Sequence, residues 1–118
     1  VLGLTFKPET DDLREAPALY ILPMLVEAGA VIRAHDPQGM KEARALLPGA
    51  IEFVEDVYSV FDGADAVVLM TEWNLYRGLD SEEIARRMQG RVFVDLRNVY
   101  DPVTMRYLGF SYHGVGRP

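Results

Sequence analysis

Short apolar runs alternate with amphipathic stretches along the whole chain. Ala66 to Met70 is continuously apolar, as expected of a strand buried on both faces. Leu19, Leu22 and Val26 recur at helical spacing, and Gly29 follows them as a stop signal. The pattern predicts strands over residues 1–6, 31–35, 51–54, 66–70, 91–95 and 110–113. It predicts helices over residues 17–28, 37–47, 57–61, 81–89 and 102–108, with a helical turn after 71–73. Asp56 and Ser81 are expected to cap the third and fourth of these helices, and Asp101 to begin the last. Pro23 is expected to kink or loosen the first helix.

This order of elements predicts one α/β domain. Strands that alternate with helices at short spacing form right-handed βαβ units and a parallel sheet. We expect an open doubly wound, Rossmann-like sheet of about six mostly parallel strands with helices on both faces. Ligands of such sheets bind beyond the carboxyl ends of the strands. That rule points to residues 7–14, 35–37, 71–74 and 95–98.

Composition narrows the classes of function. The net charge of −6 argues against nucleic-acid binding, which needs a basic face. The chain has no cysteine, so a thiolate metal site and a cysteine nucleophile are excluded within it. Its apolar runs are far shorter than the roughly 20 residues that span a membrane. We therefore expect no membrane partner and a cytoplasmic protein. Val1 already lies in an apolar run, so we expect a segment of a longer protein.

The first loop is unlike a dinucleotide-binding loop. That loop needs Gly-x-Gly-x-x-Gly so that pyrophosphate can approach bare backbone. Here Gly3 stands alone and the bulky Phe6 lies in the turn, although Asp36 mimics the acidic residue that binds ribose. We do not expect NAD to bind this chain in the usual manner.

A response-regulator receiver domain is an alternative interpretation of the same alternation of strands and helices. Asp11 and Asp12 could supply its acidic pair, but Glu55 and Asp56 fit its third-strand aspartate poorly. Arg97 stands where that chemistry needs a lysine, so this reading is the weaker one.

The stretch Phe6-Lys7-Pro8-Glu9-Thr10-Asp11-Asp12-Leu13-Arg14-Glu15-Ala16-Pro17 is the strongest signal. It resembles the loop that opens the C-terminal domain of the UDP-glucose/GDP-mannose dehydrogenase family. The family pattern is Gly-hydrophobic-(Ala/Thr)-Phe-Lys-x-x-Thr-x-Asp-x-Arg-Glu-(Ser/Ala)-Pro. Further matches follow in order: Gly29, His35-Asp36-Pro37 (more often Tyr-Asp-Pro), Ala64-Asp65-Ala66, Thr71-Glu72-Trp73 and Asp95-Leu96-Arg97-Asn98. The matches span nearly the whole chain.

The resemblance implies that residues 1–118 are the nucleotide-sugar (UDP)-binding C-terminal domain of a longer enzyme. In this family an N-terminal NAD-binding domain and a central helical dimerisation region complete the protein, which implies a homo-oligomer. The implied reaction is that of an NAD-dependent UDP-glucose 6-dehydrogenase, which makes UDP-glucuronate in two hydride transfers through a catalytic cysteine. Because that cysteine lies outside this chain, we expect no catalytic residue here and an inactive isolated domain.

Four residues take their expected roles from the matched positions. The backbone of Phe6, the side chain of Lys7 and Arg97 match positions that contact the UDP-sugar. Arg14 matches an arginine that reaches the NAD held by another domain. Each has a plainer reading as well. Lys7 could pair with a neighbouring loop carboxylate, Arg14 could be a local salt-bridge partner, and Arg97 could pair with Asp95.

Other polar residues of the loops have structural readings. We expect Thr10 and the two following aspartates to fix the first loop by hydrogen bonds to backbone amides. Trp73 could stack on uracil, but packing under the loops is the preferred interpretation. His35 and His113 have no partner at metal-ligand spacing, so neither is proposed as a metal ligand.

Two alternatives to the UDP-glucose reading stay open. Dehydrogenases of UDP-N-acetyl sugars or of GDP-mannose share the loop pattern, and the residues that shape a sugar pocket are outside this chain. A non-catalytic nucleotide-binding module would also account for a short chain without a nucleophile.

Overall fold

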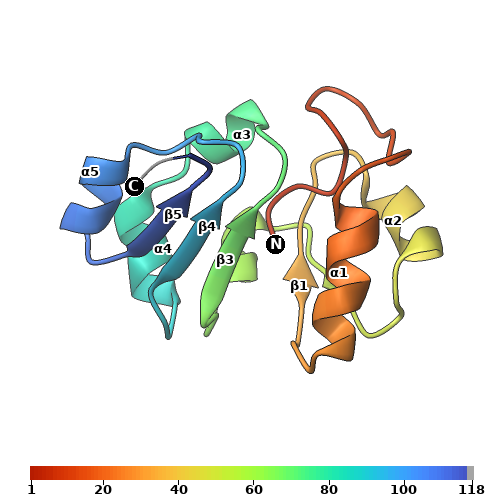
Figure 1. Cartoon of the computed structure of the whole chain (residues 1–118), viewed down its shortest axis with the longest axis horizontal. Helices are drawn as coiled ribbons and strands as arrows, with labels where there is room; N and C mark the ends of the chain where they lie inside the picture. The colour runs from red at the N-terminus through yellow and green to blue at the C-terminus, as the bar shows by residue number, and fades with distance from the viewer. Residues whose placement is uncertain (117–118) are drawn as a thin grey trace.

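The computed structural model describes residues 1–116 and contains five short strands, all parallel (Figure 1). β1 (Arg33–Ala34) pairs with β2 (Glu52–Phe53) in one sheet. β3 (Ala66–Leu69), β4 (Val92–Asp95) and β5 (Ser111–Gly114) form a second sheet in that order. The α/β class and the parallel pairing are therefore as predicted. The expected single sheet of about six strands is wrong, because the described chain has five strands in two sheets.

The predicted first strand is reduced to two bridges at Leu2. Leu2 pairs in parallel with His35 on one side and with Leu69 on the other, so it lies between the two sheets (Figure 1). The chain leaves the extended conformation at the next residue, since Gly3 has a φ of +92°. A Cβ at Gly3 would lie 2.5 Å from the Cβ of Thr71, so only glycine fits there. The strand ends early because its backbone turns immediately after this close approach.

The helices lie near their predicted positions. They are α1 (Ala18–Glu27), α2 (Met40–Leu46), the 3₁₀ helix η1 (Val57–Phe61), α3 (Asn74–Arg77), α4 (Ser81–Arg87) and α5 (Pro102–Tyr107). Asp56 and Asp101 cap η1 and α5 through their carboxylates, as expected. The cap of α4 is Asp80 rather than the predicted Ser81. The carboxylate of Asp80 accepts hydrogen bonds from the backbone amides of Glu82 and Glu83. The first turn of a helix leaves such amides without a partner inside the helix.

α1 runs without a break through Pro23. The proline ring removes one backbone donor, yet the helix continues for a further turn beyond it instead of breaking there. The helix ends where predicted: Gly29 has a φ of +100° and its amide donates to the carbonyl of Val26.

Two hydrophobic clusters stabilise the molecule. The first, in the half that contains β1, β2, α1 and α2, is mainly aliphatic and includes Leu4, Leu22 and Ile51. The second, in the half that contains β3 to β5, is rich in aromatic residues and centres on Phe93 and Tyr76. Phe93 makes edge-on contacts with two aromatic rings at centroid distances of 5.2 and 5.7 Å. Both clusters lie below the carboxyl-end loops and so provide a fixed base for them.

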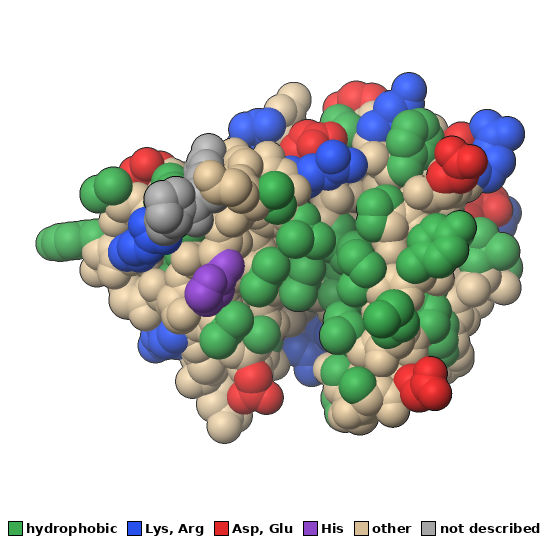
Figure 2. Space-filling view, viewed as in Figure 1, with side chains coloured by type: hydrophobic (Ala, Val, Ile, Leu, Met, Phe, Trp, Pro, Cys, Tyr) green, Lys and Arg blue, Asp and Glu red, His purple; other side chains and the backbone are tan. Residues whose placement is uncertain are grey.

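Hydrophobic side chains make up a large part of one face of the molecule. Figure 2 shows them over α1 and the middle of this face, while acidic and basic side chains lie along the upper edge and also at the left and lower edges. Tyr20 and Met24, one turn apart on α1, are both about two-thirds exposed, at 68% and 67%. Within residues 1–116 no helix combines the length and apolar character needed to cross a membrane.

Candidate functional site

Asp36 joins three of the four carboxyl-end loops. It is fully buried, and its Oδ2 accepts from the amides of Leu4 and Thr5 at 2.7 and 3.2 Å. The same oxygen accepts from the indole of Trp73 at 3.3 Å, while Oδ1 accepts from the amide of Gly39 at 2.7 Å. A carboxylate offers about four lone-pair sites, and neutral donors fill them here. Asp36 therefore has no acceptor capacity left for a ribose hydroxyl and acts as an anchor for the loops.

Trp73 and Thr71 pack beneath the loops. Trp73 is 4% exposed, which agrees with the preferred interpretation of packing and leaves no ring face for a base. The hydroxyl of Thr71 donates to the carbonyl of Thr5, so the loop after β3 is tied to the first loop. The backbone on both sides of Glu72 is thereby held by buried neighbours.

Asp95 is the matching anchor at the end of β4. It is fully buried, and its Oδ2 accepts from the amides of Val99 and Tyr100 and from the hydroxyl of Tyr112 at 2.6–2.9 Å. Its Oδ1 accepts from the backbone amide of Arg97 at 3.1 Å. The predicted pair between Asp95 and the guanidinium of Arg97 is not formed, because backbone donors and a tyrosine already fill the carboxylate.

The guanidinium of Arg97 instead joins the first and third loops. Its Nη2 donates to the carbonyl of Phe6 at 2.9 Å and its Nε to the carbonyl of Met70 at 3.1 Å. The carboxylate of Glu72 lies 3.3 Å from the same Nε. We call this group of Arg97, Phe6, Met70 and Glu72 the inner brace. Its longest link spans 91 residues of sequence.

Residues 7–15 form the outer loop, whose side-chain hydrogen bonds are local, although buried Leu13 packs into the aliphatic cluster. Thr10 Oγ1 accepts from the amide of Asp12 at 3.1 Å, and Asp12 Oδ1 accepts from the amide of Arg14 at 2.9 Å. These bonds confirm the expectation that Thr10 and an aspartate fix the loop. The guanidinium of Arg14 also pairs with Asp12 at 2.8 Å, although the Arg14 side chain is 89% exposed. Hydrogen bonds from Arg14 lower the pKa of Asp12 to about 2.

Lys7 lies at the exposed junction of the inner brace and the outer loop. Its Nζ is 5.3 Å from the centroid of the Phe6 ring. Within residues 1–116 it makes no ion pair, so the plainer reading of a pair with Glu9 or Asp11 is wrong. Lys7 therefore presents an exposed cation without an ion pair in residues 1–116, although its charge contributes to the lowered pKa of Asp12. It follows Phe6, whose carbonyl accepts from Arg97.

Three residues of these loops adopt the left-handed backbone conformation without being glycine. Glu9 and Glu15 flank the outer loop with φ values of 63° and 61°, and Asn98 follows Arg97 with a φ of 54°. Such residues cost free energy and concentrate at functional loops. The side chain of Asn98 exchanges two hydrogen bonds of 2.9 Å with the backbone of Val115, which holds its loop to the end of β5.

His35, next to Asp36, is a buried structural residue. Its Nδ1 is 2.9 Å from the hydroxyl oxygen of Tyr76, and that hydroxyl donates to the carbonyl of His35 at 3.0 Å. Because the hydroxyl has one proton, Nδ1 must carry a proton for the second contact to be a hydrogen bond. Burial lowers the pKa of His35 and raises that of Tyr76. The neutral pair is held inside the protein.

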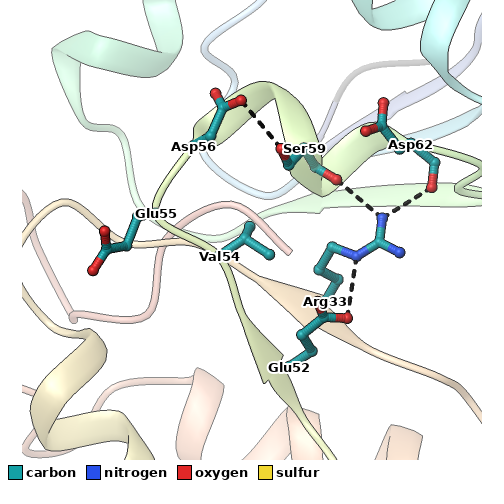
Figure 3. A pocket seen from close by; sticks show the side chains of 7 residues that line it. All are labelled: Arg33, Glu52, Val54, Glu55, Asp56, Ser59 and Asp62. Atoms are coloured by element: carbon teal, nitrogen blue, oxygen red, sulfur yellow. Dashed lines mark hydrogen bonds and ion pairs between the residues drawn. The ribbon is translucent and has the colours of Figure 1, made fainter.

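A cavity of about 540 Å³ lies between β1, β2 and η1 (Figure 3). Arg33 points into it and donates to the carbonyls of Ser59 and Asp62 at 3.0 and 2.9 Å, with Glu52 Oε2 3.5 Å from its Nε (Figure 3). Glu55 and three further lining residues complete its wall: Val54, Asp56 and Ser59. Four carboxylates around one internally paired arginine disfavour an anionic ligand.

A second cavity of about 670 Å³ lies beside the outer loop, against α1 and α2. Its lining combines Asp11, Asp12 and Glu42 with one cation, Arg14, which is already paired with Asp12. Lys7 and Arg97 line neither of these two cavities. Lys7 and Arg97, which with Phe6 form what we call the cationic edge, are thus separate from both cavities.

Residues 1–102 match the model of the UDP-glucose/GDP-mannose dehydrogenase family, UDP binding domain. The chain belongs to this family. A UDP-glucose 6-dehydrogenase of Rhizobium meliloti is 44% identical over 118 residues, which cover 100% of this chain and 27% of that protein. One of Pseudomonas aeruginosa is 45% identical over 121 residues, covering 98% of this chain and 27% of that protein. The chain thus spans about a quarter of the length of these relatives.

Solved structures of the family share the fold. A UDP-glucose dehydrogenase from Pyrobaculum islandicum matches with a TM-score of 0.80 and 38% identity, covering 99% of this chain and 24% of that one. An NDP-N-acetyl-D-galactosaminuronic acid dehydrogenase from Methanosarcina mazei matches with a TM-score of 0.84 and 30% identity, covering 98% and 24%. The family membership inferred from the loop motifs is therefore confirmed.

Sequence reasoning singled out the stretch Thr71-Glu72-Trp73 but gave Glu72 no role. The residue that pairs with Arg97 could not be found from spacing, because Glu72 and Arg97 meet only through the parallel packing of β3 and β4. The motif match at Glu72 was the available signal.

Proposed function

We propose that residues 1–118 are the nucleotide-sugar-binding C-terminal domain of a longer, NAD-dependent UDP-glucose 6-dehydrogenase. The full-length enzyme would oxidise UDP-glucose to UDP-glucuronate in two hydride transfers, in the cytoplasm and as a homo-oligomer. The family match and the names of the bacterial relatives support this substrate. The cysteine required for the chemistry would come from the remainder of the protein, since this chain has none.

The UDP-sugar would bind at the edge formed by Phe6, Lys7 and Arg97. The observation that carries this proposal is the bond of 2.9 Å between Arg97 Nη2 and the carbonyl of Phe6, which brings distant candidate residues to one place. Lys7 adds a cation without an ion-pair partner in residues 1–116, and the Nη1 of Arg97 has no hydrogen-bond partner there. Charge-assisted bonds from such groups suit phosphate and sugar oxygens.

NAD does not fit this chain as it fits a dinucleotide-binding domain. Asp36 is saturated by internal donors, and the first turn contains Phe6 in place of a glycine-rich loop. When bound by another part of the protein, NAD would accept the hydride. Arg14 would then face this cofactor from the outer loop, and to do so it would share or exchange its pair with Asp12.

A UDP-N-acetyl-sugar substrate is the second candidate. The match to the Methanosarcina mazei NDP-N-acetyl-D-galactosaminuronic acid dehydrogenase, with a TM-score of 0.84, supports this candidate. The cationic edge would bind the shared nucleotide part in either case. The sugar would then be selected by residues outside the chain.

Calorimetric titration of the full-length protein separates these candidates. UDP-glucose, UDP-N-acetylmannosamine, GDP-mannose and NAD are each titrated, and NADH production is followed with each sugar nucleotide. We expect UDP-glucose to bind and to be oxidised, while the isolated 118-residue chain produces no NADH. Oxidation of only an N-acetyl sugar would favour the second candidate. NAD binding without a response to any sugar nucleotide would refute both.

A further inference from the structure

The guanidinium of Arg97 is held on one side only. Met70 and Phe6 accept hydrogen bonds from Nε and Nη2 through their carbonyl oxygens, at 3.1 and 2.9 Å. Glu72 adds an opposite charge 3.3 Å from Nε. The Nη1 amino group has no hydrogen-bond partner in the described residues 1–116. One edge of the group is thus fixed, and the other edge keeps free donors.

Glu72 is placed on an unusually fixed piece of loop. Thr71 before it is fully buried and bonded to the carbonyl of Thr5, and Trp73 after it is buried and bonded to Asp36. The carboxylate itself is part-exposed, with side-chain exposures of 28% for Glu72 and 35% for Arg97. An ion pair this exposed adds little to stability. The ion pair therefore serves to orient the guanidinium of Arg97 rather than to stabilise the fold.

We propose that Glu72 is a positioning residue of the nucleotide-sugar site. It holds the Nε edge of Arg97 against the two carbonyls and leaves Nη1 to the ligand. This inference rests on the proposed binding role of Arg97. A carboxylate that balances the charge at the fixed edge also keeps the guanidinium from turning its free donors toward other loop carbonyls.

The test uses the full-length protein with UDP-glucose as the probe, titrated without NAD and then assayed with it. We expect Glu72→Gln to raise the Kd and the KM by roughly three- to tenfold, with little change in kcat. In an Arg97→Ala background the same substitution should have no further effect. Glu72→Asp, which keeps the charge but shortens the reach, should weaken binding in the same direction.

Glu83→Gln is the matched control. Glu83 also lies 3.3 Å from an arginine, Arg87, and both of these side chains are 33% exposed, but the pair lies on α4. This variant should bind UDP-glucose like the wild type. Circular dichroism confirms that each variant is folded before titration.

The outcomes separate this inference from the proposed function. Wild-type binding by Arg97→Ala would refute the role of Arg97 and the inference together. Weak binding by Arg97→Ala with unchanged binding by both Glu72 variants would refute the inference alone. Tighter binding by Glu72→Gln would show that Glu72 competes with the ligand, and additive losses in the double variant would show that it acts independently of Arg97. Either result would overturn the positioning role.

Discussion

The inner brace and the outer loop are neighbours on the same edge but are held in opposite ways. Arg97 in the inner brace contacts carbonyls 27 and 91 residues away in sequence. Arg14 in the outer loop forms its hydrogen bonds and its ion pair, within residues 1–116, with Asp12 alone, two residues away. The first arginine depends on the whole fold for its position, whereas the second needs only its own turn. We infer that the inner brace is a preformed wall and that the outer loop can rearrange its exposed pair.

The largest expected effect on stability is at the anchor beneath the inner brace. Asp95→Ala removes the acceptor of the amides of Val99 and Tyr100 and one of the two acceptors of the Tyr112 hydroxyl. Unsatisfied buried donors cost about 1–3 kcal/mol each, so we expect a loss of about 3 kcal/mol or more in the free energy of unfolding. Urea denaturation of the 118-residue chain measures it. A loss no larger than that of Asp101→Ala, which removes a surface cap, would contradict the assignment of Asp95 as an anchor.

The next effect is on ligand binding. Arg97→Ala removes the guanidinium from the proposed site while its exposed position spares the core. Hydrogen bonds to charged groups are worth about 1.5–3 kcal/mol, so we expect roughly 10- to 100-fold weaker binding of UDP-glucose by the full-length protein. Calorimetry measures the change. Arg106→Ala, on α5, is the comparison and should leave the affinity intact.

The buried His35 should make the stability of the protein depend on pH. Burial lowers the pKa of His35 below its ordinary value of about 6.5, so the unfolded chain takes up this proton first as the pH falls. The contribution of His35 to stability should be complete above pH 6.5 and be lost below it, with a slope of up to about 1.4 kcal/mol per pH unit. Urea midpoints between pH 8 and pH 5.5 test this. His35→Gln should flatten the decrease, and a slope that stays as in the wild type would count against the assignment.

The smallest expected effect is in the outer loop. Asp12→Asn removes the charge that pairs with Arg14, but the Arg14 side chain is 89% exposed and such a pair adds little, so we expect no measurable change in the urea midpoint near neutral pH. A clear loss of stability would mean that the outer loop is built like the inner brace. The two regions would then not differ as proposed.

Local signals in the sequence predicted most elements of the fold. The caps Asp56 and Asp101, and the stop at Gly29, were correctly placed because each acts within a few residues. The predicted first strand was wrong because its end is set by Gly3, which packs against Thr71 from a distant loop. Periodicity alone does not report such a close approach.

In the candidate site too, contacts between residues close in sequence were predicted, and contacts between distant residues were not. The bonds of Thr10 and Asp12 in the outer loop were foreseen because Asx-type turns are local. The partner of Arg97 was not, because Asp95 is adjacent in sequence but is filled by buried donors, whereas Glu72 reaches the arginine only in three dimensions. The motif resemblance identified the candidate site residues, and the three-dimensional fold determined which of them are in contact.

The central claim is that the unpaired cation at the cationic edge binds the nucleotide sugar, and the two lysines of the chain test it directly. Lys7→Ala and Lys41→Ala are made in the full-length protein, and Lys41 on α2 is exposed but lies away from this edge. The Kd for UDP-glucose is measured by calorimetry. We expect Lys7→Ala to weaken binding by roughly tenfold or more while Lys41→Ala binds like the wild type. Equal affinities of both variants and the wild type would contradict the proposed site.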